Sequence, residues 1–171
     1  MASRRRNSPG TAACPKFIVS ACLAGVNCTY NGKNKLKARI RDMVVEGLAV
    51  CVCPEMAGGA PLSRERCEIS GGDGRGVLSG HARVKTVSGK DITRRMISGA
   101  ENTLKIAKKS GVKLAIMKSK SPSCGRGMIY DGTFRGNLRR GDGVTTALLR
   151  EHGIRVYNEK DIKLWPLKSI M

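Results

Sequence analysis

Residues 16–28 read KFIVSACLAGVNC, a short apolar run followed directly by a polar stretch that carries two cysteines. The run Lys16–Ser20 has the length of a strand and ends in polar residues, which predicts a buried β-strand. Similar apolar runs return at Leu48–Cys53, at Lys113–Met117 and at Ile154–Tyr157. We interpret the four runs as the strands of one sheet, and this interpretation decides the predicted fold.

Amphipathic segments separate these strands. Leu36, Ile40, Met43 and Val44 recur at helical spacing within residues 33–46. Similar patterns run from Asp91, a plausible N-cap, to Gly111, and from Val144 to Glu151. Strands that alternate with helices predict an α/β fold, specifically a three-layer, Rossmann-like domain with a mostly parallel open sheet and helices on both faces.

Three further segments complete the predicted domain. The glycine-rich stretch Gly58–Gly80 is interpreted as a long functional loop, because loops of this length are rare in compact domains without a role. The alternation in Arg83–Val87 predicts a peripheral strand. Residues Gly127–Phe134 predict a small hairpin whose turn is Asp131-Gly132.

The domain boundaries follow from composition. Residues 1–15 combine Arg4, Arg5 and Arg6 with serine, proline and glycine, which predicts a flexible basic arm. The domain is expected to span residues 16–160, and residues 161–171 form a C-terminal tail. Nothing in the sequence assigns an oligomeric state.

The composition favours a basic globular protein. The 171 residues include 32 Lys and Arg against 13 Asp and Glu, which gives a formal net charge of +19. A hydrophobic content of 40% excludes a disordered polycation. No segment approaches the about 18 consecutive apolar residues of a membrane span. The charge favours anionic partners such as nucleic acid, although it could serve solubility alone. With 4% aromatic residues, a base-stacking platform is not expected.

Cysteine usage indicates a reducing compartment. The seven cysteines are an odd number, and the first residues lack the apolar core of a secretory signal, so we expect a cytoplasmic protein without a disulfide framework. The spacing Cys51-x-Cys53 is too tight for the usual structural zinc motif, so Cys51 is expected in the core.

Three cysteines each follow a predicted strand: Cys22, Cys53 and Cys124. The carboxyl ends of parallel strands meet at one edge of a sheet, where ligands collect in folds of this kind. Three thiolates there could hold a zinc ion with an open position, or an iron–sulfur cubane with one iron lacking a protein ligand. A closed structural site would need a fourth ligand, for which Cys28 and Cys67 are candidates. Spacing alone leaves these alternatives open.

The order of several longer motifs is more specific. The chain contains, in this order, Ser20–Gly25, Cys53-Pro54-Glu55 with Gly58-Gly59, Gly71–Gly74, Lys118–Gly125 (KSKSPSCG), Ile129–Phe134 and Gly141–Thr145. With these motifs the chain resembles the DUF523 or thiouracil desulfidase (TudS) family over about residues 16–158.

The resemblance implies a [4Fe-4S] cluster bound by Cys22, Cys53 and Cys124, with one iron open to a substrate sulfur. The family's reaction is a hydrolysis without net redox chemistry. The thiocarbonyl sulfur would bind the open iron, which acts as a Lewis acid, and water would add to the adjacent carbon. Sulfide is then released, and the thiolated base becomes uracil.

The family motifs also contain candidates for proton transfer and substrate binding. Glu55 is the candidate for activating water or protonating the ring. Ser123 is the first choice for a hydrogen bond to substrate or cluster sulfur, with Ser121 as the second.

Two functions from different classes are therefore considered. The first is a desulfidase acting on a thiolated pyrimidine, either a free base, a nucleoside or a base within tRNA; the positive charge and Arg135, Arg139 and Arg140 make tRNA a candidate partner. The alternative is a basic RNA-binding module with a structural zinc site.

Overall fold

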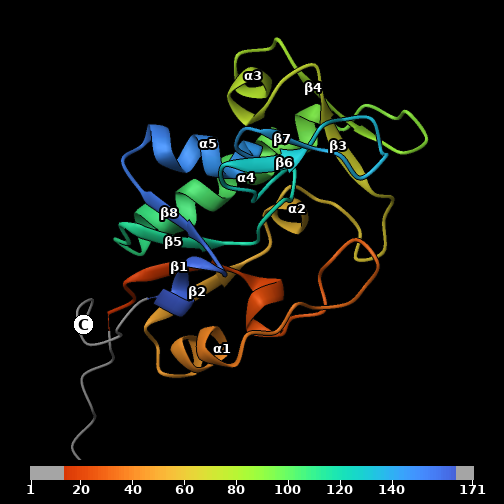
Figure 1. Ribbon diagram of the computed structural model, residues 1–171. Coiled ribbons are helices and arrows are strands. Elements are labelled where there is room, and N and C mark those ends of the chain that lie inside the picture. Colours follow the sequence, from red (N-terminus) through yellow and green to blue (C-terminus); the bar gives the residue numbers. More distant parts are fainter. Residues whose placement is uncertain (1–13, 165–171) are drawn as a thin grey trace, which may run out of the picture.

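A four-stranded parallel sheet forms the centre of the protein, in the order β2-β1-β5-β8 (Figure 1). The structure is a computed structural model that describes residues 14–164. The strands of this sheet are β1 (Phe17–Ser20), β2 (Ala49–Val52), β5 (Leu114–Met117) and β8 (Arg155–Asn158). All four predicted strands are confirmed.

The strand register aligns the carboxyl ends. Phe17 of β1 pairs with Ala49 of β2 and with Leu114 of β5, and Leu114 pairs with Arg155 of β8. Parallel strands that start at one level and have equal length also end at one level. The loops that follow β1, β2 and β5 therefore leave the same edge of the sheet.

Helices cover both faces of the sheet, as predicted (Figure 1). On one face lie η1 (Ala21–Ala24) and α1 (Ala38–Val45), and on the other α4 (Thr93–Lys109) and α5 (Val144–Glu151). Within the described residues, no helix is long and apolar enough to cross a membrane.

The alternation of β1 divides the core into two layers. Phe17 and Val19 pack with Ile40 of α1 in one cluster, whereas Ile18 packs with Leu104 of α4 in another. These five side chains are at most 8% exposed. Burial on both faces explains why β1 is an uninterrupted apolar run rather than an alternating one.

A smaller antiparallel region rests on α4 beside the sheet. It contains the ladder of β3 with β4 and the hairpin of β6 with β7. The short helices α2 and α3 lie in connections between strands, and η2 follows β8. Their bounds are β3 Cys67–Ser70, β4 Arg83–Thr86, β6 Met128–Tyr130, β7 Leu138–Arg140, α2 Pro54–Ala57, α3 Gly74–Leu78 and η2 Asp161–Leu164.

The interpretation of Gly58–Gly80 as one long loop is wrong, because this stretch contains β3 and α3. The Asp73 carboxylate accepts the Gly76 N–H and caps α3. A side chain at Gly74 would overlap the backbone of Gly143, just before α5. The glycines here therefore permit close packing of short elements, not a mobile loop.

The predicted hairpin is present, but the prediction of its turn is wrong. β6 pairs with β7, so the connection spans residues 131–137 instead of Asp131-Gly132 alone. The reason is a contact across the chain: the buried carboxylate of Glu68 accepts the N–H groups of Gly132 and Phe134. These two hydrogen bonds hold the segment against β3 before the chain reverses direction.

The helix predicted for residues 33–46 begins later, at Ala38. Lys35 and Lys37 donate their backbone N–H groups to the carbonyls of Cys22 and Leu23, which holds this segment in an extended conformation against η1. The helix from Asp91 also begins slightly later, at Thr93, whose N–H the Asp91 carboxylate accepts.

Cys51 was expected in the core, but it is exposed. It belongs to the edge strand β2, and the helical layer that buries Ala49 on the same face does not extend over it.

The predicted terminal segments are largely outside the described residues. Of the basic arm, only Cys14 and Pro15 are described, and of the tail only residues 161–164, which form η2. Ile162 of this short helix is buried in the core cluster on the α1 face. The boundaries at residues 15 and 160 remain predictions.

A glycine contact positions α2 on α4. A side chain at Gly99 of α4 would overlap the carbonyl oxygen of Pro54, and one at Gly58 would overlap the carbonyl oxygen of Arg95. The backbone around Cys53 and Glu55 therefore approaches α4 to a distance that only glycine at positions 58 and 99 allows.

We expect Gly99→Ala to destabilise the protein by roughly 2 kcal/mol, because one backbone must move away from the new methyl group. The corresponding fall in Tm is about 4–8 °C, measured by circular dichroism. Lys105→Ala, at an exposed position of the same helix, is the control and should change stability by less than about 0.5 kcal/mol. An unchanged Tm for Gly99→Ala would show that α2 is not fixed by this contact.

Candidate functional site

A cavity of about 400 Å³ lies at the carboxyl edge of the sheet. Its lining comes from the segments that follow β1, β2 and β5, together with β3 and β6. Five of the seven cysteines line it: Cys22, Cys28, Cys53, Cys67 and Cys124. We call this cavity the cysteine pocket.

The three predicted cysteines reach the pocket from three strand ends. Cys22 lies in η1, which ends at Gly25 with a left-handed φ of +99°. Cys53 is the N-cap residue of α2, and Pro54 occupies the first helical position, where its missing N–H costs nothing. Cys124 lies in the loop after β5, and its N–H is accepted by the Ser121 hydroxyl. The expected convergence is therefore present in the fold.

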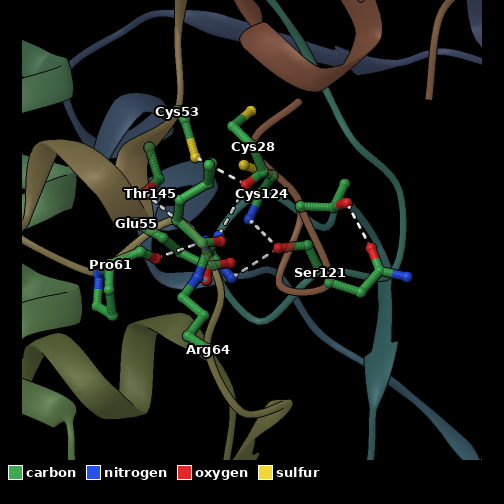
Figure 2. Close-up of polar contacts among 12 residues, drawn as sticks. Cys28, Cys53, Glu55, Pro61, Arg64, Ser121, Cys124 and Thr145 are labelled. Atoms are coloured by element: carbon green, nitrogen blue, oxygen red, sulfur yellow. Dashed lines mark hydrogen bonds and ion pairs between the residues drawn. The ribbon is translucent and has the colours of Figure 1, made fainter. Parts of the chain in front are cut away.

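Cys28, which the sequence offered only as a candidate fourth ligand, also lines the pocket. The Cys53 thiol donates to the Cys28 carbonyl oxygen, with 3.7 Å between Sγ and this oxygen (Figure 2). Cys28 is 2% exposed. The loop that carries it is thus packed against the centre of the site.

The environment raises the pKa of four thiols of the pocket, those of Cys28, Cys53, Cys67 and Cys124. Burial raises the pKa of Cys124 and that of Cys67 to about 12. A hydrogen bond with Cys22 is the main cause that raises the pKa of Cys28 to about 11, and a hydrogen bond with Cys28 is the main cause that raises the pKa of Cys53. Thiols in such surroundings become thiolates when a metal binds them.

The described residues contain no group of three or more His, Cys, Asp or Glu side chains arranged to hold a single metal ion. A cubane cluster makes a different demand, because each cysteine binds its own iron and the ligands need not meet at one point. The donor set of the pocket consists of soft sulfur ligands, which suit iron–sulfur clusters.

Glu55 lines the pocket from α2 and is held by an arginine that the sequence did not indicate. Arg64 Nε donates to Glu55 Oε2 at 2.6 Å, and the two side chains are only 10% and 18% exposed (Figure 2). The pairing joins α2 to the irregular segment before β3. No local sequence pattern predicts it.

The two candidate serines have different positions. Ser121 lines the pocket, and its hydroxyl accepts the N–H groups of Ser123 and Cys124. Ser123 is fully buried and shares a 2.8 Å hydrogen bond with Thr145 of α5. Ser123 does not line the pocket, although it directly precedes Cys124 in the chain. Ser121 is the serine with access to a bound molecule.

A partly buried ion pair supports the loop that carries Cys124. Glu159 accepts hydrogen bonds from Lys118 Nζ at 2.8 Å and from both the N–H and the hydroxyl of Ser119. Further along, Lys120 has a left-handed φ of +64°, a conformation that costs free energy outside glycine. The network thus fixes a strained loop at its base.

Positive side chains surround the pocket. Lys35, Arg66 and Lys120 line it and take part in none of the ion pairs of the described residues. The guanidinium of Arg66 lies 5.9 Å from the centre of the Phe134 ring. The predicted basic residues of the hairpin, Arg135, Arg139 and Arg140, are exposed and do not line the pocket, although Tyr130 of the same hairpin does.

Comparison with known proteins identifies the family. Residues 17–161 match the family described as 2-thiouracil desulfurase. The chain belongs to this family. It is 46% identical to the uncharacterized protein YbbK of Bacillus subtilis (strain 168) over 146 residues, which cover 85% of this chain and 97% of YbbK. The solved structure of a [4Fe-4S]-dependent thiouracil desulfidase, TudS, is 40% identical with a TM-score of 0.77 and covers 88% of this chain and 94% of that chain. The resemblance stated from the motifs is confirmed.

The Glu159 network predicts a dependence of stability on pH. Burial opposes ionisation of Glu159, but hydrogen bonds from Lys118 and Ser119 outweigh it and hold the pKa of this carboxyl below its ordinary value. A lowered pKa in the folded state stabilises the protein above the pKa of the unfolded chain, and this stabilisation is lost as the pH falls through the folded-state value.

We therefore expect Glu159→Gln to lower stability at pH 7 by roughly 2 kcal/mol and to flatten the decline in Tm between about pH 5 and pH 3. Thermal unfolding across this range is the measurement. For Glu46→Gln, at an exposed position, the curve of Tm against pH should run parallel to that of the unmodified protein. If the curve for Glu159→Gln were also parallel, the network would not be the source of the acid sensitivity.

Proposed function

We propose that this chain is a [4Fe-4S]-dependent desulfidase that hydrolyses the carbon–sulfur bond of a thiolated pyrimidine and releases sulfide. The observation that carries the proposal is the meeting of Cys22, Cys53 and Cys124, each from a different strand end, in one pocket with Glu55. Membership of the 2-thiouracil desulfurase family and the similarity to a [4Fe-4S]-dependent thiouracil desulfidase support it.

The residues of the pocket fit such a cluster. Cys22, Cys53 and Cys124 would hold it through three irons, and their segments are tied to the ends of a rigid sheet. When bound, the cluster would supply an iron without a protein ligand, a Lewis acid that polarises the carbon–sulfur bond of the substrate. The proposed ligand set leaves Cys28 and Cys67 as further thiols of the lining.

Glu55 is the proposed proton carrier. Its Oε2 is engaged by Arg64, and Oε1 has no hydrogen bond with the described residues, so this oxygen can accept a proton from the attacking water. The reaction converts the thiocarbonyl and water into the carbonyl and hydrogen sulfide. The proton taken from water can return to the ring or to the leaving sulfur, so the carboxylate is regenerated.

Ser121 is the proposed donor to the substrate. Because its hydroxyl oxygen already accepts two backbone N–H groups, its own proton is available for an acceptor in the pocket. We propose that Ser123 supports the site from behind the pocket, where its hydroxyl shares a hydrogen bond with Thr145. This reverses the preference between the two serines that the motif alone suggested.

We propose further that the substrate can be a thiolated base within tRNA. The unpaired cations of the pocket rim and the exposed Arg139 and Arg140 on β7 would provide a path for a phosphate backbone. A free base needs no such path. A cytoplasmic location agrees with the absence of disulfides among the seven cysteines.

Protein purified without oxygen is expected to be brown and to contain about four irons and four sulfides per chain. Cys22→Ser, Cys53→Ser and Cys124→Ser should each lose most of the iron and the broad visible absorption. Cys51→Ser is the matched control, because Cys51 is exposed and lies outside the pocket. Stoichiometric zinc without iron would instead favour the basic RNA-binding module with a structural zinc site.

The substrate is identified by sulfide release from 2-thiouracil, 4-thiouracil and thiolated tRNA, compared side by side. Replacing Arg139 and Arg140 by glutamate should lower kcat/KM for thiolated tRNA at least tenfold and reduce its dependence on salt, without changing kcat/KM for a free base. The double variant Arg41→Glu with Arg155→Glu is the control, because it makes the same change in charge at exposed positions of α1 and β8. Equal effects of the two double variants would contradict a tRNA path over the hairpin.

A further inference from the structure

The Glu55–Arg64 ion pair stands between two cavities. Beside the cysteine pocket lies a second cavity of about 320 Å³, formed by the segment after α2 and the first residues of α4. Glu55, Arg64 and Cys67 line both cavities. Glu55 is therefore part of the wall between the two cavities, and it borders open space on both sides.

Arg64 is fixed far more firmly than Glu55. Its Nη1 donates to the carbonyl oxygens of Pro61 and Leu62, and its Nη2 donates to the carbonyl oxygen of Cys28 at 3.0 Å. Together with the 2.6 Å bond from Nε to Glu55, every nitrogen of the guanidinium has a partner. Such a planar fork, bonded in several directions, has one orientation.

These bonds connect the parts of the site that lie outside the sheet. The Cys28 carbonyl belongs to the segment after η1, Glu55 belongs to α2, and Pro61 and Leu62 belong to the segment between α2 and β3. The Cys53 thiol donates to the same Cys28 carbonyl oxygen, at 3.7 Å. Arg64 thus ties the position of Glu55 to a carbonyl that also holds Cys53, one of the proposed ligands.

We propose that Arg64 is a positioning residue that fixes the Glu55 carboxylate in the wall, so that the free oxygen Oε1 serves the water that attacks the substrate. The inference rests on the proposed function and deepens it. Without the arginine, Glu55 is free to adopt other rotamers toward either cavity, and the proportion of molecules ready for the proton transfer falls. Lysine cannot replace it, because a single ammonium group cannot span Glu55 and three carbonyls in different directions.

Arg64→Lys tests this with the positive charge retained. We expect kcat per bound cluster to fall at least thirtyfold, with KM changed by less than threefold and with iron content and visible spectrum unchanged. Arg150→Lys is the matched control, since Arg150 also pairs with a carboxylate, that of Asp142, but lines neither cavity. Loss of iron from Arg64→Lys alone would overturn the proposal, because Arg64 would then serve only the fold of the cysteine segments.

A double-mutant cycle shows whether Arg64 acts through Glu55. In the Glu55→Gln background, Arg64→Lys should lower the remaining rate by less than threefold. A full thirtyfold fall in that background would overturn the inference, since Arg64 would then act independently of the carboxylate.

The position of Glu55 gives a readout that needs no activity. Crystal structures of the protein and of Arg64→Lys should show one Glu55 rotamer in the former and several in the latter. An unmodified protein without desulfidase activity would defeat the proposed function. One fixed Glu55 rotamer in both structures would defeat the positioning role, whatever the activity.

Discussion

The equal register of three neighbouring parallel strands is the constraint on which the site depends. Phe17 pairs with both Ala49 and Leu114, so β1, β2 and β5 deliver their following residues to one level of the sheet edge. Cysteines separated by tens of residues in sequence can then line the same pocket. A slip of one residue would turn each strand's side chains to the opposite face and separate the thiols. The buried layers on both sides of β1 oppose such a slip.

The central fold was predictable because its signals are local and strong. Four apolar runs of strand length, separated by amphipathic segments, leave few alternatives to a parallel α/β sheet, and the order of chain and sheet places Cys22, Cys53 and Cys124 at one edge. The errors fall where a distant contact overrides a local pattern. Asp131-Gly132 is a good turn by itself, but Glu68 binds the next residues first.

The parts of the site that the sequence did not indicate have one property in common. Arg64 reaches Glu55 and Cys28 through hydrogen bonds between segments of irregular structure, and Thr145 reaches Ser123 from the start of α5. Neither contact has a periodicity or a fixed spacing. Motifs therefore indicate the proposed reacting residues here, whereas the residues that orient them emerge only once the chain is folded.

The polar groups of the pocket also show how its chemistry is separated from its scaffold. Glu68 Oε2 accepts two N–H groups of the connection between β6 and β7, and Glu159 accepts hydrogen bonds from Lys118 and Ser119 at the base of the Cys124 loop. Both carboxylates therefore fix a neighbouring segment. Glu55 differs, because its Oε2 is engaged by the side chain of Arg64, and its Oε1 has no hydrogen bond with the described residues. This free oxygen lies on the helix that begins directly after a proposed cluster ligand, Cys53.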